Sequence, residues 1–239
     1  MARQRPTAPT VQPKAGARPA ARVATRPKAK RPVLLVLAGV NGAGKSSIGG
    51  NVMLRGAGMA WFNPDTYTRM LMQGGLALAE ANAQAWQHGV DLLDQAVAAG
   101  HSHAFETTLG GATMTQRIAA ASSTHDVLMW YCGLSSAEQH IARVANRVAA
   151  GGHAIPEAKI RERWIHAPLN LIGLMPRLSE LRVFDNSAEA MPGQPVDDPR
   201  PVLHLRSGVV RFPATLADLE RTPVWAKPID KAARDLAGR

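Results

Sequence analysis

Cysteine and long apolar runs are almost missing from this chain of 239 residues. The single cysteine, Cys132, excludes an internal disulfide and a zinc site built from cysteines, and it fits a reducing interior. The longest apolar run, residues 33–40, is far shorter than the roughly 20 residues that a membrane-spanning helix needs. We therefore expect a soluble, cytoplasmic protein without a membrane partner.

Acidic residues are absent from residues 1–31, which carry nine of the ten net positive charges of the chain. Five prolines and very few large apolar side chains in this segment oppose a packed core or a sustained helix, so we predict a disordered basic tail. Three interpretations stay open: an arm without a specific ligand, which we favour, a contact with nucleic acid or another anionic surface, and a targeting peptide. Any polycation binds nucleic acid, so we expect such binding to be weak if it occurs.

Residues 39–46 read Gly-Val-Asn-Gly-Ala-Gly-Lys-Ser and match the phosphate-binding pattern G-x-x-x-x-G-K-[ST] in full. The apolar run before them, residues 33–38, predicts a strand buried on both faces of a parallel sheet, and a helix is expected over 46–55. In such a loop glycines let backbone N–H groups surround phosphates, the lysine reaches the terminal ones and the serine holds Mg²⁺. The sequence thus predicts ATP and Mg²⁺ as cofactors, with Ser46 as the metal ligand. The predicted ATP-binding residues are Gly39, Asn41, Gly42, Ala43, Gly44, Lys45, Ser46 and Ser47.

Strand-like and helix-like segments alternate after this loop. Further strands are expected at residues 59–62, 103–105, 126–132 and 181–184, and helices at 76–99, 135–150 and from 156 onward. A capping box of Ser135 and Glu138 is expected to start the second of these helices. This order predicts an α/β fold with a doubly wound, parallel, five-stranded sheet. Residues 202–205 and 209–212 predict a small hairpin, followed by a short helix at 229–237.

Polar side chains follow two of the predicted strands, at the edge where the ligands of open α/β sheets collect. Asp65 follows the strand at 59–62, and its carboxylate could orient an attacking hydroxyl and accept its proton in phosphoryl transfer. Glu106, Thr107 and Thr108 follow the strand at 103–105 and could bind a polyhydroxyl substrate; Glu106 could instead hold a Mg²⁺-bound water. We therefore predict a substrate site made of these four residues, with Asp65 also catalytic.

Arginines occupy both sides of the glycine-rich turn at residues 151–156. Arg143 and Arg147 are four residues apart and share one helix face, and Arg161 and Arg163 lie on the helix that follows. Two such helices could form a lid that closes on phosphates and brings positive charge to the transferring group. A solvated or salt-bridged helix face is the alternative explanation for any one of them.

Four segments, taken in this order, resemble the zeta-toxin family of small P-loop kinases. They are Phe62-Asn-Pro-Asp65, His103-Ala-Phe-Glu-Thr-Thr-Leu-Gly110, the run from Arg143 to Pro156, and Val183-Phe-Asp-Asn-Ser187. The resemblance covers about residues 33–190 and implies ATP-dependent phosphorylation of a sugar hydroxyl on UDP-N-acetylglucosamine. It also implies a toxin–antitoxin kinase, with an antitoxin protein as a possible partner.

The same resemblance implies roles for particular residues and a domain organisation. Asp65 would be the base, Arg147 and Arg163 would be the lid arginines that act with Lys45 in catalysis, and Asp185–Ser187 would lie beside the adenine. The expected organisation is a disordered basic tail at 1–31, a P-loop kinase domain with a helical lid at 32–190, and an extension at 191–239 that packs on the same domain. The tail has no counterpart in the family pattern.

Two other classes of protein stay open at this point. The Asn-Gly-Ala-Gly-Lys-Ser wording of the loop is also typical of transporter-type ATPases, but the chain has neither their Leu-Ser-Gly-Gly-Gln signature nor an apolar strand ending in Asp-Glu. The other class is a nucleic-acid-associated kinase or ATPase that uses the basic tail. The net charge of only +1 on residues 32–239 opposes a dedicated polynucleotide groove.

Overall fold

The computed structural model describes residues 30–45, 61–189 and 198–238. Several predictions therefore lie outside the described residues: most of the basic tail, the helix at 46–55 with Ser46 and Ser47, and residues 59–60 of the second strand. Arg31, which we had included in the tail, belongs to the folded part. Its guanidinium donates hydrogen bonds to the carbonyls of Ser122 and His125 at 2.8 and 3.1 Å.

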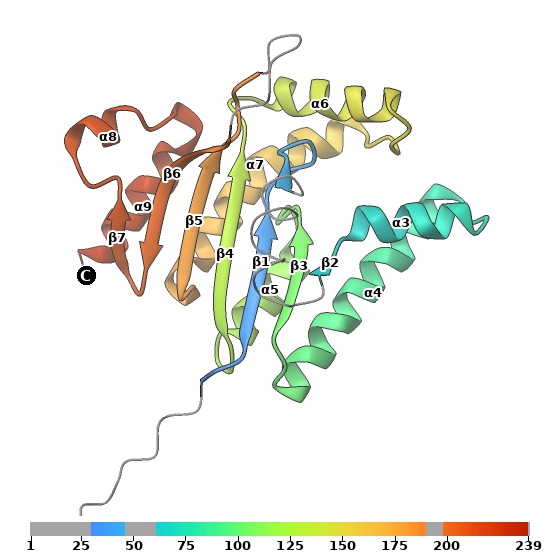
Figure 1. Cartoon of the computed structure of the whole chain (residues 1–239), viewed down its shortest axis with the longest axis horizontal. Coiled ribbons are helices and arrows are strands. Elements are labelled where there is room, and N and C mark those ends of the chain that lie inside the picture. The colour runs from blue at the N-terminus through green and yellow to red at the C-terminus, as the bar shows by residue number, and fades with distance from the viewer. Residues whose placement is uncertain (1–29, 46–60, 190–197, 239) are drawn as a thin grey trace, which may run out of the picture. The chain divides into compact units, whose positions relative to one another are not determined.

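One mixed sheet of seven strands runs through the described residues, in the order β2-β3-β1-β4-β5-β6-β7 (Figure 1). The strands from β2 to β5 pair in parallel, whereas β6 and β7 pair antiparallel. The prediction of five parallel strands is thus wrong in the number of strands and in the direction at one edge. The bounds are β1 Val33–Ala38, β2 Trp61–Phe62, β3 His103–Thr107, β4 Asp126–Gly133, β5 Glu180–Asp185, β6 Arg200–Arg206 and β7 Val209–Phe212.

The two additional strands are the hairpin predicted in the C-terminal extension. Leu205 of β6 lies opposite Leu181 of β5, and Leu203 lies opposite Val183, and all four side chains are buried. Because these residues continue the buried face of β5, the hairpin extends the sheet instead of packing against it. Its turn has two residues with positive φ, Ser207 at 50° and Gly208 at 74°, as a two-residue hairpin loop requires.

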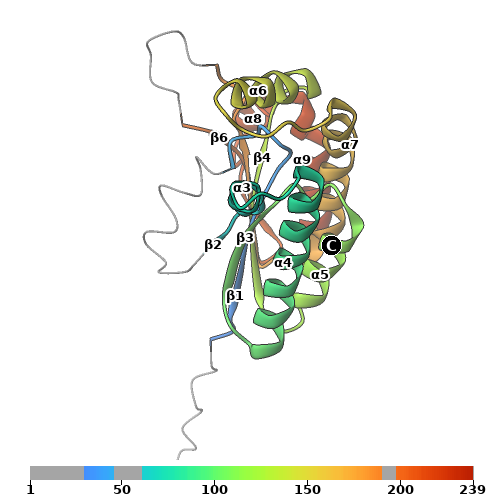
Figure 2. The same cartoon turned by 90° about the vertical axis from the view of Figure 1, so that its right-hand side faces the viewer.

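Seven α-helices accompany the sheet within the described residues. Four of them, α4, α5, α7 and α9, lie along the same face of the sheet in Figure 2. The helix predicted at 46–55 is not described, so helices on both faces stay a prediction. None of the described helices combines the length and apolar character that crossing a bilayer requires. The bounds are α3 Pro64–Gln73, α4 Leu78–Ala99, α5 Ala112–Ala121, α6 Ala137–Ala149, α7 Glu157–Leu174, α8 Leu216–Glu220 and α9 Lys227–Ala237.

The central strand β1 confirms the prediction of a strand buried on both faces. Leu34 and Val36 are completely buried, while Leu35 and Leu37 on the opposite face are 7% and 6% exposed. Its neighbours in register include Phe105 of β3, opposite Val36. Burial on both sides fixes the position at which β1 ends, and therefore the position of the loop that follows it.

Two helix starts differ from the prediction. We had interpreted Pro64 only as the end of a strand, but Asn63 is an N-cap whose side chain accepts a hydrogen bond from the Thr66 N–H at 3.0 Å. Proline suits the first helical position because its missing N–H would have no partner there, so Asp65 lies in the first turn of α3.

At the start of α6 the predicted capping box of Ser135 and Glu138 is wrong. The N-cap is Ser136, and its side chain accepts a hydrogen bond from the backbone N–H of Gln139 at 3.1 Å. Helix α5 was not predicted.

The C-terminal part joins the end of β5 through Asp185, whose side chain is 11% exposed. Trp225 donates its indole N–H to Asp185 Oδ1 at 3.3 Å, and Arg200 of β6 contacts Oδ2 at 3.1 Å. The indole ring covers Gly133, where an added Cβ would come within 2.4 Å of it. The carboxyl end of β5 is therefore fixed by residues that come later in the chain.

Candidate active site

The loop after β1 turns sharply on three glycines. Gly39, Gly42 and Gly44 have φ of 143°, 82° and 85°, which other residues rarely adopt. An added Cβ would lie 2.3 Å from the carbonyl oxygen of Cys132 at Gly39, and equally close to the Asn186 amide at Gly44. Positive φ and close packing, by a backbone carbonyl at Gly39 and by a side-chain amide at Gly44, therefore favour glycine at these positions.

Three neutral side chains bind carbonyl groups of this loop. The Nδ1 atom of His140, on α6, lies 2.8 Å from the carbonyl oxygen of Asn41. The Cys132 thiol and the Asn186 amide both donate to the carbonyl of Ala43, at 2.9 Å each. These bonds occupy carbonyl oxygens, which would repel a phosphate, and they hold the loop in its curve.

Burial keeps two of these side chains uncharged. Desolvation lowers the pKa of His140 to about 4, against a smaller rise from its hydrogen bond to Asn41. Burial also raises the pKa of the Cys132 thiol to about 12, although Lys45 and Arg143 oppose this shift. At neutral pH His140 is a neutral ring and Cys132 is a thiol, so each keeps a proton to donate.

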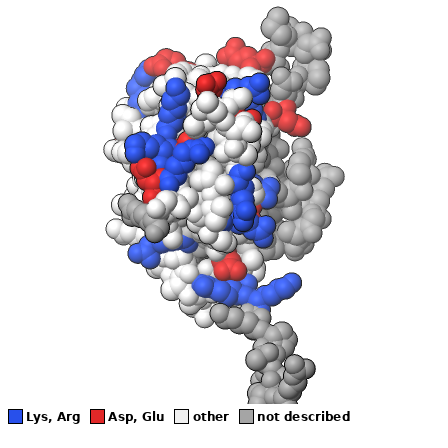
Figure 3. Space-filling view, turned by 90° about the vertical axis from the view of Figure 1, so that its left-hand side faces the viewer, with Lys and Arg blue, Asp and Glu red and all other residues white. Residues whose placement is uncertain are grey.

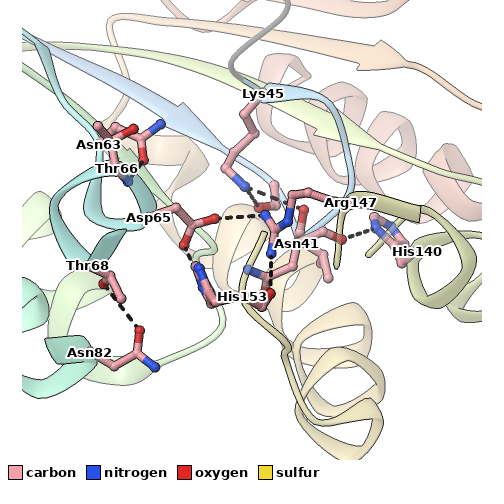
Figure 4. Close-up of polar contacts among 12 residues, drawn as sticks. Asn41, Lys45, Asn63, Asp65, Thr66, Thr68, Asn82, His140, Arg147 and His153 are labelled. Carbon is pink, nitrogen blue, oxygen red and sulfur yellow. Dashed lines mark hydrogen bonds and ion pairs between the residues drawn. The ribbon is translucent and has the colours of Figure 1, made fainter. Parts of the chain in front are cut away.

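Lys45 closes the loop. Its ammonium donates to the carbonyl of Gly39 at 2.8 Å and approaches that of Val40 at 3.5 Å, so it bends back over the start of the loop (Figure 4). This conformation puts a positive charge at the carboxyl end of β1. The predicted Mg²⁺ ligand Ser46 and the neighbouring Ser47 lie outside the described residues. The described residues contain no cluster of three or more His, Cys, Asp and Glu suited to a metal.

Asp65 lies between two groups from the α6–α7 region (Figure 4). Arg147, near the end of α6, donates from Nη1 to Asp65 Oδ2 at 2.9 Å. His153, in the turn after α6, brings Nε2 to 3.7 Å from Oδ1. The side chains of Asp65 and Arg147 are 37% and 34% exposed, so a charged pair lies at the surface of the site.

Arg163, on α7, contacts the loop instead of Asp65. It donates from Nη1 to the Asn41 side-chain oxygen at 2.7 Å, and its own stem lies against Gly110, where a Cβ would clash at 2.5 Å. Burial lowers its pKa, and the charge of Asp65 partly offsets this. The two chosen lid arginines thus contact opposite sides of one site, Arg147 at Asp65 and Arg163 at the loop.

The other two arginines of the predicted lid are bound elsewhere. Arg143 donates to the carbonyl of Ala188 at 2.9 Å, and Arg161 pairs with Glu138 at 2.6 Å on the surface. For Arg161 the salt-bridged helix face is therefore the better explanation.

The end of β3 lies beside the start of the loop. Thr107 is opposite Ala38 in the register, and its carbonyl accepts from the Gly39 N–H at 3.2 Å. Its hydroxyl accepts from the Leu109 N–H at 3.0 Å and keeps its own proton for another acceptor. The preceding residue, Glu106, is 6% exposed, and Thr108 follows at the start of the connection to α5. The strand end therefore offers polar groups next to the phosphate loop.

Sequence reasoning missed the contacts of His140 and His153 and the function of the Cys132 thiol as a donor. Each depends on a partner far away in the chain: 99 residues separate His140 from Asn41. The position of Asp185–Ser187 beside the adenine stays a prediction; the side chain of Asn186 in this segment binds the phosphate loop. The only local signal for His153 was its place in the Gly-Gly-His-Ala-Ile-Pro turn.

A family model described as zeta toxin matches residues 19–191 of this chain. The chain belongs to the zeta toxin family. This confirms the resemblance inferred from the four segments, and family membership together with the loop supports an ATP-dependent kinase. A comparison with curated proteins found no match.

Several solved structures are similar to this zeta toxin family member, and the AvrRxo1 complexes share its fold. A complex of AvrRxo1-ORF1 and AvrRxo1-ORF2 with sulphate ions is 16% identical with a TM-score of 0.59, over 85% of this chain and 64% of that one. The same pair with ATP gives 16% and 0.58, over 86% and 64%. A structure from the PezAT chromosomal toxin–antitoxin system of Streptococcus pneumoniae is 11% identical, with a TM-score of 0.49 over 67% and 69%. The chain thus spans slightly under two thirds of the AvrRxo1 chains that it matches.

Proposed function

We propose that this protein is an ATP-dependent phosphotransferase that phosphorylates a hydroxyl of a small molecule. The observation that carries the proposal is that two features lie close together. One is the loop that turns on three glycines and ends in Lys45. The other is the Asp65 carboxylate, whose charge acts on Arg163, the arginine that is hydrogen-bonded to Asn41 of this loop. Phosphoryl transfer needs positioned phosphates, neutralising cations and a group that orients the attacking hydroxyl.

The loop fits a triphosphate. Three residues with positive φ curve the backbone, and neutral donors occupy the carbonyls of Asn41 and Ala43. The backbone N–H groups from Gly42 to Lys45 and the Lys45 ammonium would hold the phosphates, as in other loops of this pattern. ATP supplies the phosphoryl group and Mg²⁺ would offset its charge, with Ser46 as the proposed metal ligand.

The acceptor would bind between α3 and the end of β3. Asp65 receives the hydroxyl proton while the acceptor oxygen bonds to the terminal phosphorus and ADP leaves. Glu106, Thr107 and Thr108 would hold other hydroxyls of the acceptor, and Arg147 and Arg163 would neutralise charge on the transferring group. The acceptor hydroxyl becomes acidic only late in the transfer, so the main contribution of Asp65 is to direct the hydroxyl oxygen at the phosphorus.

We further propose a nucleotide sugar such as UDP-N-acetylglucosamine as the acceptor, in the manner of a toxin–antitoxin kinase. Membership in the zeta toxin family supports this choice. An antitoxin protein would then be a partner that controls the activity. The proposed division is a tail at 1–30, a kinase domain at 31–190 and an extension at 191–239 that is part of the same folded unit.

The test is incubation of the purified protein with ATP, Mg²⁺ and UDP-N-acetylglucosamine, followed by mass spectrometry for one added phosphate. We expect Asp65→Asn to lose transfer and to retain ATP binding. Asp94→Asn is the matched control, because Asp94 also pairs with an arginine, Arg117 at 3.1 Å, but on the surface of α4. Transfer at the wild-type rate by Asp65→Asn would remove Asp65 from its proposed role. Phosphate added only to other sugars would change the acceptor and leave the kinase proposal in place.

A nucleic-acid-associated kinase or ATPase is the second candidate, favoured only by the nine positive charges of residues 1–31. On the face drawn in Figure 3, Lys and Arg form separate groups with Asp, Glu and uncharged residues between them. Deleting residues 1–29 would keep Arg31, which is bound to the folded part. This candidate would be supported if the full chain binds or phosphorylates polynucleotides and the truncated variant does not.

A further inference from the structure

His153 is enclosed next to the proposed base. Its side chain is 6% exposed, and its Nε2 atom lies 3.7 Å from Asp65 Oδ1. This distance is too long for a hydrogen bond, and Nε2 has no hydrogen-bond partner within the described part of the chain. A polar ring atom buried without a partner is costly, so its position facing a carboxylate needs an explanation.

Asp65, Arg147 and His153 contact one another in a ring, which is called the circuit below. Arg147 donates to Asp65 Oδ2 at 2.9 Å, and its other terminal nitrogen lies 3.5 Å from the main-chain carbonyl oxygen of His153. The imidazole of His153 returns to Asp65 from the other side. The circuit connects α3 with the end of α6 and with the turn before α7, as Figure 4 shows. Movement of that turn would therefore move the carboxylate.

The charges around the ring have opposite effects on it. Burial lowers the pKa of His153, and Arg147 and Arg69 lower it further, whereas Asp65 raises it. The net result is a pKa below the ordinary value, so the ring is neutral at pH 7. Arg163 of α7 is a further cation near Asp65.

We propose that His153 is a positioning residue that holds the Asp65 carboxylate with Oδ1 directed at the acceptor hydroxyl. Arg147 occupies Oδ2, so Oδ1 is the oxygen that takes the proton. Each carboxylate oxygen has two lone pairs, so Oδ1 can face both the imidazole and the incoming hydroxyl. This inference rests on the proposed function, in which Asp65 acts as the base, and it adds which oxygen reacts and what holds it.

The kinetic test compares three substitutions with UDP-N-acetylglucosamine as acceptor. We expect His153→Ala to lower kcat about tenfold with an unchanged KM for ATP, because a small misplacement of a base slows transfer but not nucleotide binding. His153→Gln, which can still direct an amide N–H at Oδ1, should recover most of the loss. His166→Ala is the matched control, because His166 is an exposed histidine on α7. Wild-type kcat in His153→Ala, or a change in KM for ATP alone, would overturn the proposal.

A second measurement does not depend on activity. The imidazole resonances of His153 are followed by NMR from pH 4 to 9 in the wild type, Asp65→Asn and Arg147→Gln. We expect the pKa of His153 to fall in Asp65→Asn and to rise in Arg147→Gln, the directions set by the charges removed. If the wild type transfers no phosphate, the proposed function fails on its own, and the titration still decides this inference. A pKa of His153 that is indifferent to Asp65→Asn would refute the contact on which it rests.

Discussion

The two halves of the candidate site, called the nucleotide side and the acceptor side after their proposed ligands, are held in opposite ways. On the nucleotide side, buried neutral groups bind backbone carbonyls: His140 is 1% exposed and Asn186 is 7% exposed. On the acceptor side, a carboxylate about one third exposed is held by the guanidinium of Arg147 and by an imidazole. The nucleotide side therefore depends on burial and shape, and the acceptor side depends on charge.

This difference sets what each half can do. A buried donor that loses its acceptor stays desolvated without a partner, so the phosphate loop resists a change in shape. A partly exposed ion pair contributes little to stability, so the contact between Arg147 and Asp65 adds little to the free energy of unfolding. We infer a rigid cradle for the triphosphate and an acceptor contact that adds little stability, and four predictions test this contrast.

The largest effect is expected at Lys45, the charged group on the nucleotide side. Lys45→Met should lower phosphoryl transfer about a thousandfold, because it removes a cation from the transferring phosphate. Lys159→Met is the control, since Lys159 pairs with Glu162 on the surface of α7. Initial rates with saturating ATP measure both. Equal rates in the two variants would refute the assignment of Lys45.

The second prediction concerns pH and the neutrality of His140. Its pKa is about 4 in the folded protein and 6.5 ordinarily, so between these values the unfolded chain binds a proton that the folded one does not. Stability from this group is complete above pH 6.5 and falls with decreasing pH, by on the order of 3 kcal/mol once pH passes below 4. Urea unfolding over this range should show a shallower decline for His140→Asn than for the wild type. Parallel declines would mean that His140 is protonated in the folded protein.

The third prediction compares two glycine-to-alanine substitutions, one that adds only backbone strain and one that also adds a steric clash. Gly44 and Gly75 both have positive φ, 85° and 97°, but an added Cβ meets the Asn186 amide at 2.3 Å only at Gly44. Gly75→Ala should cost about 1 kcal/mol from strain, and Gly44→Ala about 2 to 3 kcal/mol with weakened ATP binding. Thermal unfolding and nucleotide titration measure the two effects. Equal costs would mean that the loop is not packed tightly against Asn186.

The smallest effect is expected for the stability of the acceptor side. Asp65→Asn should change the free energy of unfolding by less than about 1 kcal/mol, because the pair that it breaks is partly exposed. Urea unfolding at pH 7 compares it with Asp94→Asn. A loss of several kcal/mol would show that the acceptor side is built like the nucleotide side, and the contrast would fail.

The sequence predicts the nucleotide side better than the acceptor side. The loop and β1 follow from a local pattern, since a continuous apolar run and fixed glycine positions need no partner elsewhere. Helix α3, which carries Asp65, was missed because Asn63-Pro64 was interpreted as a strand end, although Asn followed by Pro is also a helix start. The start of α3 is therefore visible in the local sequence.

Other differences could not have come from local rules. The sixth and seventh strands join the sheet because β6 pairs antiparallel with β5, which depends on how two apolar faces meet after folding. The contact of His153 with Asp65 joins residues 88 positions apart in the sequence and depends on where α3 and the α6–α7 turn come together. Arg147 and Arg161 look alike in the sequence, and only the packing of α6 and α7 separates the site arginine from the surface one.

The hydrogen bonds at Asp185 indicate how much of the C-terminal part the folded kinase domain needs. The family match stops at residue 191, yet Arg200 and Trp225 bind Asp185, the neighbour of the asparagine that holds the phosphate loop. Truncation at the family boundary would turn β5 into an open edge with unpaired backbone groups and would uncover Gly133. The smallest folded form of the proposed enzyme is therefore expected to extend through α9, because the last fifth of the polypeptide fixes the strand end beside the phosphate loop.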